Sequence, residues 1–545
     1  MISIQRINFS NRAARRHIRG HCGAENRSPP RSTPVNPPSR RSGGGTLAAA
    51  CLAIMVSQIA NVVPAPINGT IQESLGADGV ALAWVTSAFL LPTAILELSF
   101  GVLGDLLGRR RVLIGGTAVL AAGALVSGSA HSVHQLWAGQ ALAGIGAGAL
   151  IPTSLAIAVA GAATAEQRSR GVATWTLSMS LGTMLGVVVS GALAENVSWH
   201  ASFYLVAPLA LLSLAVTALF ARESKSPEGR SLDWPGQAAV AVGMFALLYG
   251  IVEGAGVSWT SPRTIVALVA GVAGLVAFVL IERRVAAPML HLAVFRVPAF
   301  SAAAGAAVIG MFSFLGSVYA LSIRIGALQH KTGIHAAVFF VILQGVPCLL
   351  GPVLPRMMRR FGARRLVTGG LLLLSAGEFW LAALPIGNAS LAVHVGPLLL
   401  EGIGFLFIVS AMTSAAIDAV PLSYTGMASA AISTARDFGM CVGPSVVSAV
   451  ALSAATGALP GRLASAGTPA PQVAAATAAA DKGGPFAVLG IPGPPAEAAL
   501  NALAHGFSVG LVLCAAASLL AALATALWLR ESSERAVLTE VPAAA

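Results

Sequence analysis

The stretch Gly101-Val-Leu-Gly-Asp105-Leu-Leu-Gly108-Arg109-Arg110-Arg111 joins two apolar stretches, residues 81–104 and 112–130. Each apolar stretch has about 20 residues, and a helix of that length crosses the hydrocarbon core of a bilayer. The charged link between them belongs at the membrane surface, because charged side chains are costly inside lipid. This part of the sequence therefore predicts two antiparallel membrane helices joined by a tight, arginine-rich turn.

Apolar stretches of the same kind recur between Leu47 and Leu529. Of the 545 residues, 56% are hydrophobic and 10% are charged, and the mean hydropathy is +0.79. A soluble fold could not cover so much apolar surface with so few polar side chains. We predict an all-α integral membrane protein with fourteen transmembrane helices, at 47–67, 81–104, 112–130, 136–160, 171–194, 202–220, 235–253, 264–282, 299–322, 335–356, 366–385, 393–417, 427–453 and 505–529.

Basic residues are distributed unequally between the two sides that these spans define. With the N-terminus inside the cell, the cytoplasmic segments hold most of them, including clusters at 109–111, 222–230, 283–296 and 356–365. The external side holds Arg263, Arg324, Lys331, Arg462 and Lys482. Cytoplasmic loops of membrane proteins are enriched in Lys and Arg. We therefore expect both termini in the cytoplasm. Lysine makes up only three of the 33 basic residues, which is typical of a GC-rich bacterial genome and favours a bacterial cell membrane.

The two ends of the membrane region repeat one another. Gly182-Thr-Met-Leu-Gly186 resembles Gly439-Met-Cys-Val-Gly443, and Gly108–Arg111 resembles Gly362–Arg365 at nearly the same offset. Transporters are often built from such repeats, with the substrate held between them. We predict two pseudo-symmetric six-helix halves, 46–220 and 299–530, and a linker, 221–298, that carries two inserted central helices.

Three further segments have unusual composition. Residues 1–45 are rich in Arg, Pro, Ser and Gly, which predicts a disordered cytoplasmic leader held near anionic lipid. We expect neither a secretory signal nor nucleic-acid binding in this leader, and a start codon placed too early is an alternative origin for it. Residues 455–504 are Ala/Pro/Gly-rich and almost uncharged, which predicts a flexible external loop without a domain of its own. Residues 531–545 are expected to form a cytoplasmic tail.

The arginine-rich link is similar to the G-x-L-x-D-x-x-G-R-[RK] signature of the major facilitator superfamily. In that family the loop is a cytoplasmic latch that is made and broken as the two halves rock. The resemblance assigns this role to Gly101, Asp105, Gly108, Arg109 and Arg110. A short Gly/Arg loop that only sets topology is the alternative, and eleven residues in register argue against it.

Nearly all of residues 46–530 resembles the fourteen-span drug:proton antiporters, the multidrug efflux branch of that family. The stretches that carry the resemblance are Ser198–Pro208, Leu232–Gly236, Pro288–Arg296 and Val420–Gly439. It implies a monomeric secondary transporter that exports small amphipathic or cationic compounds by alternating access. The proton gradient would supply the energy, and no cofactor is implied. Partners would be the small-molecule substrate and membrane lipid.

Several positions depart from the antiporter pattern. The first span reads Val56-Ser-Gln-Ile-Ala-Asn61 without the usual acid, and the fourth span has Gln140 where the family has Arg. The family associates these charges with proton handling, so the usual residues do not predict coupling here. Candidates for the cavity or for helix packing seams are Asn61, Gln140, Gly144, Gly148, Gly182 and Gly186, and packing seams are the more common role of such glycines.

Ionisable residues inside predicted spans are candidate proton or cation sites, because they are expensive in lipid. They are Glu97, Glu378, Glu401, Arg436 and Asp437. Glu378 lies nearest to mid-depth, where desolvation disfavours the charged carboxylate and suits reversible protonation. Phe379 and Trp380 beside it could contact an apolar or cationic substrate. A neutral Glu378 hydrogen-bonded to a neighbouring helix is an equal alternative.

The other ionisable residues also have alternatives. Glu97 could replace the missing first-span acid, or it could pair with the Arg109–Arg111 cluster. Glu401 lies close enough to the outer face for its carboxylate to reach water. Arg436 could pair with Asp437, with Glu378 or with a helix-end carbonyl.

Other classes of function fit the sequence less well. It has no G-x-x-x-x-G-K-[ST] loop for ATP, no histidine or cysteine cluster with metal-ligand spacing, and no recognisable catalytic set, so we expect neither a primary pump, a metal site nor an enzyme. Two alternatives to proton-coupled export remain. One is an uncoupled facilitator or importer of a small metabolite, and the other is a membrane sensor derived from a transporter.

Overall fold

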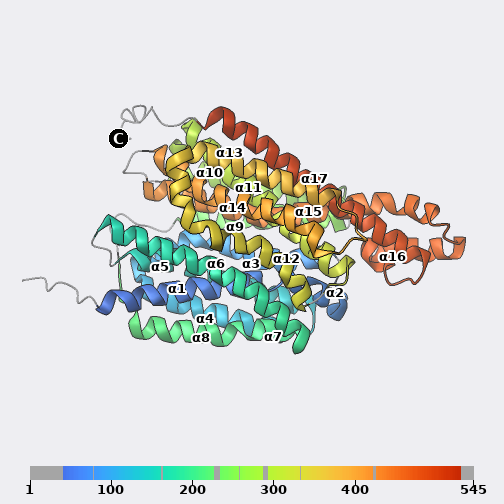
Figure 1. Ribbon diagram of the computed structural model, residues 1–545, viewed down its shortest axis with the longest axis horizontal. Helices are drawn as coiled ribbons and strands as arrows, with labels where there is room; N and C mark the ends of the chain where they lie inside the picture. The colour runs from blue at the N-terminus through green and yellow to red at the C-terminus, as the bar shows by residue number, and fades with distance from the viewer. Residues whose placement is uncertain are drawn as a thin grey trace, which may run out of the picture. The chain divides into compact units, whose positions relative to one another are not determined.

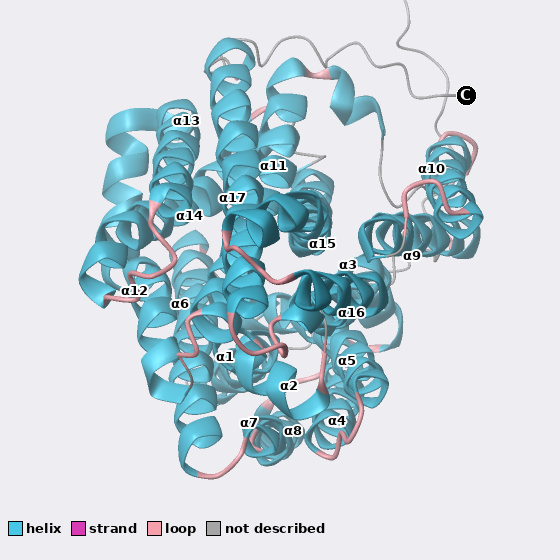
Figure 2. Ribbon diagram, turned by 90° about the vertical axis from the view of Figure 1, so that its right-hand side faces the viewer, coloured by secondary structure: helices cyan, strands magenta, loops and turns pink. Residues whose placement is uncertain are grey.

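The computed structural model describes residues 41–77, 79–160, 164–225, 233–256, 258–285, 292–331, 333–420 and 425–529. All regular structure in these ranges is helical (Figures 1 and 2). Thirteen helices are long and apolar enough to cross a membrane, and the bent pair Ala81–Glu97 and Ser99–Leu107 makes up to fourteen. This confirms the prediction of an all-α, fourteen-helix fold. In lipid a helix satisfies its own backbone hydrogen bonds, which is why apolar stretches of this length adopt it.

The predicted leader and tail fall largely outside the described residues. Helix α1 begins at Arg41, inside the segment predicted to be disordered up to residue 45. Nothing further is described before Arg41 or after Leu529.

The N-terminal half consists of six long helices and three short ones. The long helices are α1 (Arg41–Val62), α3 (Gly79–Leu107), α4 (Arg109–Gly128), α5 (Val133–Ala160), α6 (Ala165–Asn196) and α8 (Val206–Phe220). The short ones are η1 (Ala65–Ile67), α2 (Asn68–Leu75) and α7 (Trp199–Tyr204). Helix α5 packs against both α3 and α4, and α1 packs against α6. The loop residue Gly108, with φ 117°, separates α3 from α4.

The C-terminal half has six helices that are long and apolar enough to cross a membrane. They are α11 (Pro298–Ser322), α12 (Gly333–Leu350), α13 (Leu354–Ala383), α14 (Leu391–Asp418), α15 (Thr425–Ser465) and α17 (Pro494–Trp528). The short turns η2 (Leu292–Arg296), η3 (Ile323–Leu328) and η4 (Gly351–Val353) flank α11 and α12. Helix α13 is broken at Gly362, with φ 75°. Gly362 therefore has a left-handed backbone like Gly108, at the position where the sequence repeat aligns the two.

Two packing seams join the halves. Helix α3 packs against α15, and α6 packs against α12. The inserted helices α9 (Trp234–Gly256) and α10 (Pro262–Glu282) pack on each other, and α9 also contacts α3 and α15. The inserted pair therefore lies along one seam only. There the Nε2 of Gln237 donates to the carbonyl of Ile95 at 2.7 Å, close to the 52° bend in α3.

The prediction that residues 455–504 form a flexible loop is wrong. Helix α15 continues to Ser465, α16 spans Ala470–Val488, and α17 starts at Pro494. These helices run past the ends of α2 and α12 (Figure 1). They hold a small apolar cluster of Leu459, Leu463, Ala476, Val488, Ala498, Ala499 and Ala502. Alanine is the best helix former, and prolines at helix starts lose no hydrogen bond, so this composition builds helices when it has a partner to pack on.

Candidate functional site

A cavity lies between the two halves. Its walls come from α1, α3 and α6 on one side and from α11, α12, α14 and α15 on the other. It holds about 160 Å³ of free space, similar to an engineered cavity that accommodates benzene. Drug-sized ligands occupy pockets of about 300–1,000 Å³. A molecule larger than this free space therefore fits only if the lining side chains or the two halves move.

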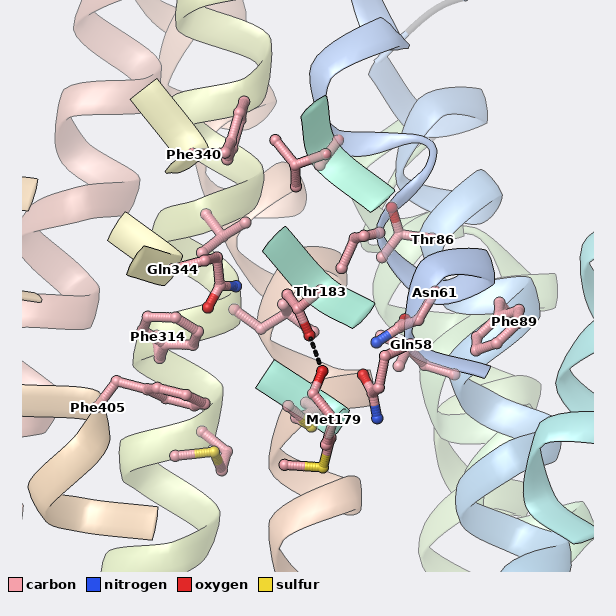
Figure 3. Close-up of a pocket in the computed structure, with 18 of the residues that line it drawn as sticks. Gln58, Asn61, Thr86, Phe89, Met179, Thr183, Phe314, Phe340, Gln344 and Phe405 are labelled. Atoms are coloured by element: carbon pink, nitrogen blue, oxygen red, sulfur yellow. Dashed lines mark hydrogen bonds between the residues drawn. The ribbon is translucent and has the colours of Figure 1, made fainter. Parts of the chain in front are cut away.

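Aromatic rings and neutral amides face this cavity (Figure 3). The rings of Phe314 and Phe405 are stacked with centroids 4.0 Å apart. Gln344 lies on the same side, and Gln58 and Asn61 lie across the cavity from it (Figure 3). Apolar walls with a few polar groups are the usual lining for an amphipathic small molecule. Of these residues, the sequence singles out only Asn61, because a phenylalanine in an apolar span looks like any other apolar residue.

The remaining seam candidates lie within the N-terminal half. A Cβ at Gly144 would come within 2.1 Å of the carbonyl of Phe89, and one at Gly182 within 2.5 Å of the carbonyl of Met55. Gly148 faces α3 and Gly186 faces α1 in the same manner. A Cβ at these positions would lie 3.1 and 2.6 Å from the nearest atom of the facing helix. Gln140 is buried and donates to Ser127 Oγ at 3.1 Å. These residues hold helices together and do not line the cavity.

An ionic cluster crosses the α3–α15 seam at the edge of the cavity. Arg436 Nε donates to Asp437 Oδ1 at 2.8 Å, and Arg436 Nη2 lies 4.0 Å from Glu97 Oε2. Glu97 and Asp437 face one another closely enough to share a proton. When both carboxyl groups are ionised, Glu97 Oε2 and Asp437 Oδ2 have no hydrogen-bond donor. Two carboxyl groups share one guanidinium, so the cluster carries an excess negative charge whenever both are ionised. Glu97 thus pairs with Arg436 rather than with the Arg109–Arg111 cluster.

The residues of the arginine-rich link gather where α3 ends and α4 begins, which we call the motif end. Asp105 Oδ1 accepts from Arg109 Nε at 3.0 Å and from Arg109 Nη2 at 2.8 Å. Glu223 Oε1 accepts from the Arg110 backbone N–H at 3.1 Å. A Cβ at Gly108 would lie 2.6 Å from the Glu223 carboxylate, and one at Gly101 would lie 3.6 Å from Pro152. The loop is therefore closed over the segment that follows α8.

At the other end, called here the distal end, backbone segments of the two halves meet. Asn68 Nδ2 donates to Ser322 Oγ at 2.9 Å, and Ser322 Oγ donates to the carbonyl of Ala65. A Cβ at Gly69 would lie 2.6 Å from the carbonyl carbon of Gly326. Glu195 Oε2 accepts from the backbone N–H of Ile334 at 2.9 Å. These contacts close the cavity toward the distal end.

The last group of candidates lies in the C-terminal half, away from the cavity lining. Glu378 on α13 and Glu401 on α14 are both 0% exposed. Phe379 and Trp380 are 41% and 49% exposed, on the outer surface of α13. The expectation that this pair contacts a substrate beside Glu378 is not met, because consecutive residues of a helix point in different directions.

The chain resembles known transporters in sequence. The family model described as Major Facilitator Superfamily matches residues 50–444. Multidrug resistance protein Stp of Mycobacterium tuberculosis (strain CDC 1551 / Oshkosh) is 30% identical over 380 residues, which cover 70% of each chain. Tetracenomycin C resistance and export protein of Streptomyces glaucescens is 26% identical over 503 residues, covering 90% of this chain and 93% of its own.

Solved structures share the fold. A transporter of the POT family in complex with 5-aminolevulinic acid superposes with a TM-score of 0.56 at 13% identity, covering 89% of this chain and 95% of its own. At this identity the likeness concerns the fold alone. The family match, the fourteen helices and the cavity between two halves lead to one conclusion: the chain is a multi-pass membrane protein that belongs to the major facilitator superfamily of transporters.

Proposed function

We propose that this protein exports small amphipathic or cationic compounds from a bacterial cell by alternating access, driven by the proton gradient. The observation that carries the proposal is the Glu97–Arg436–Asp437 cluster, which joins the two halves beside a cavity lined by rings and amides. Relatives named for multidrug resistance and antibiotic export support the substrate class and the direction.

We place the motif end in the cytoplasm. The motif end contains the basic cluster at 109–111, and the alternation of the spans places the basic cluster at 356–365 on the same side of the membrane. Loops rich in basic residues are retained on the cytoplasmic side. Both termini are then cytoplasmic. The distal contacts between Asn68 and Ser322 close the cavity toward the outside, so the conformation described is closed to the exterior.

The cluster offers a mechanism for exchange. One guanidinium balances only one of the two carboxylates, so the excess negative charge attracts either a proton or the cationic group of a substrate. Both cannot bind at once without mutual repulsion, and each therefore displaces the other. Protonation of Glu97 also weakens its attraction to Arg436, which loosens the α3–α15 seam. The same event thus releases the substrate and lets the halves rearrange.

An uncoupled facilitator is the second candidate. The observation that favours it is that Ser57 in the first span and Gln140 in the fourth stand where the family has charged residues. Neither side chain can bind and release a proton, so neither can couple transport to the proton gradient. Gln140 is engaged with Ser127. The two candidates differ in whether a proton gradient changes the steady-state level of substrate.

The test uses inside-out membrane vesicles containing the full chain and a fluorescent cationic dye. We expect the dye to accumulate when the vesicle interior is acidic. Glu97→Gln should abolish this accumulation and weaken the binding of the cationic dye, because Arg436 and Asp437 then balance each other and no excess negative charge remains. Glu497→Gln, at an exposed position in the first turn of α17, is the matched control and should accumulate dye normally. Dye movement that ignores the gradient would establish the facilitator. No movement of any dye by the folded protein would overturn transport and favour a sensor.

A further inference from the structure

Two carboxyl groups of the C-terminal half are buried together and apart from the cavity. Glu378 and Glu401 come from α13 and α14, which pack against each other. A Cβ at Gly377 would lie 2.8 Å from Glu401 Cγ, so Glu401 rests against the backbone next to Glu378. The charge of Glu401 also acts on Glu378, which places the two carboxyl groups in one buried environment. Neither residue forms an ion pair with any residue that the structure describes.

The two carboxyl groups have different hydrogen-bond surroundings. Ser317 Oγ on α11 lies 2.9 and 3.1 Å from the two oxygens of Glu401 and donates to them. Neither oxygen of Glu378 has a hydrogen-bond partner. Ser518 of α17 is 0% exposed and lies close enough to Glu378 to be its hydrogen-bond partner, although the present geometry of the two groups is outside the range of a hydrogen bond. A hydroxyl shared by two oxygens suits a carboxylate, and a carboxyl that needs to donate suits the protonated form.

Among the residues that the structure describes, the other groups that face the pair bring no positive charge. Helix α17 contributes Cys514, a titratable thiol that interacts electrostatically with both carboxyl groups. Helix α11 contributes the hydroxyl of Ser317. Ser313 donates to the carbonyl of Cys514 at 3.0 Å and is thereby engaged. Two ionised carboxylates this close in a medium of low dielectric repel strongly, so one of them must be neutralised.

We infer that Glu378 and Glu401 form a proton-binding site inside the C-terminal half, distinct from the cluster at the cavity. One proton is held between the pair: Glu378 carries it, and Glu401 remains the carboxylate that Ser317 stabilises. The O–H of Glu378 then donates to the Ser518 hydroxyl, so that each of the two groups gains a hydrogen-bond partner. The site depends only on the packing of α11, α13, α14 and α17, so it stands whether or not the chain exports drugs.

Infrared difference spectroscopy of the purified full chain in lipid nanodiscs tests the site. We expect a protonated-carboxyl band, equivalent to one proton, that disappears at high pH. Glu378→Gln and Glu401→Gln should each abolish this pH-dependent component. Glu97→Gln and the exposed Glu497→Gln should retain it, which separates this site from the proposed coupling cluster.

Other outcomes would overturn the inference. Carboxyl bands of both residues that never change with pH would show two permanently neutral groups with a structural role. A band that appears only when sodium is removed would show a metal cation in place of the proton. If the glutamine variants fail to fold, Ser518→Ala replaces them: it should shift the band to higher frequency by removing a hydrogen-bond partner, and an unshifted band would contradict the assignment.

Discussion

At the scale of single residues, the cavity depends on contacts that have no charge to mark them. Phe314 and Phe405 stack on one side of the cavity, and Gln58 and Asn61 face them from α1. The sequence identifies ionisable residues in spans, because each is rare and costly there. It does not show that Glu97 and Arg436 meet, since they are far apart in the chain and come from different halves.

The stacked pair predicts a selective loss of binding. Phe405→Ala removes one ring and should weaken the binding of an aromatic dye by roughly tenfold, since ring pairs contribute about 0.5–1.5 kcal/mol beyond their buried area. Phe379→Ala is the matched control, because its ring is exposed on the outer surface. Fluorescence titration in detergent measures both. Equal effects of the two substitutions would contradict the placement of the binding site.

The glycine seam predicts a loss of stability. Gly144→Ala places a methyl group within 2.1 Å of the Phe89 carbonyl, and overpacking of this kind costs about 1–3 kcal/mol. Gly115→Ala adds the same methyl group to open space and should be neutral or stabilising by up to about 1 kcal/mol, because alanine favours helix. Thermal unfolding monitored by tryptophan fluorescence compares them. An equally stable Gly144→Ala protein would show that α3 and α5 do not pack this closely.

At the scale of elements, the length and apolar composition of a segment predict most helices correctly, and the exceptions are segments whose structure depends on packing against a distant partner. Residues 455–504 have the alanine content of a helix, yet their prolines and glycines suggested a loop. The cluster around Leu463 and Val488 gives these helices an apolar partner, and isolated helices of that length are marginal without one. Arg324 is another case. The charge pattern predicts Arg324 at the external surface, but its side chain is 2% exposed and donates to the Leu384 carbonyl.

The helical segment around α16 predicts a contrast between neighbouring residues. Ala476 is buried in the apolar cluster and Ala475 is exposed. Ala476→Asp should open the segment, because an unpaired charge cannot remain in that cluster, whereas Ala475→Asp should have little effect. Limited proteolysis between residues 465 and 494 reports the difference. Rapid cleavage of the unaltered protein would restore the interpretation of a flexible loop.

At the scale of the whole molecule, the two halves touch differently at the two ends of the cavity. At the distal end the backbones of Gly69 and Gly326 approach closely, whereas the Glu97–Arg436 pair joins the halves through side chains alone. A substrate larger than the present free space needs these contacts to break in turn. The inserted helix α9 contacts only the α3–α15 seam, so the two seams are not equivalent.

Locking the distal end should stop transport. Asn68→Cys combined with Ser322→Cys, joined by a short thiol cross-linker, holds the exterior closed, and vesicle dye transport should fall to background. The control joins Ser127→Cys and Gln140→Cys, which lie 3.1 Å apart within one half, and should leave transport intact. Transport by the fully cross-linked distal pair would contradict alternating access.

The sequence by itself determined the fourteen apolar helices, the repeat and the arginine-rich link. These depend on local properties, namely the length of apolar runs and the backbone freedom of residues such as Gly108 and Gly362. Only the tertiary structure decided which polar groups meet. Glu97 forms an ion pair with Arg436, Glu378 is buried together with Glu401, and the side chain of Phe379 is exposed on the outer surface. The physical reason is that helix rotation and pairing are set by packing between distant segments, which no single span encodes.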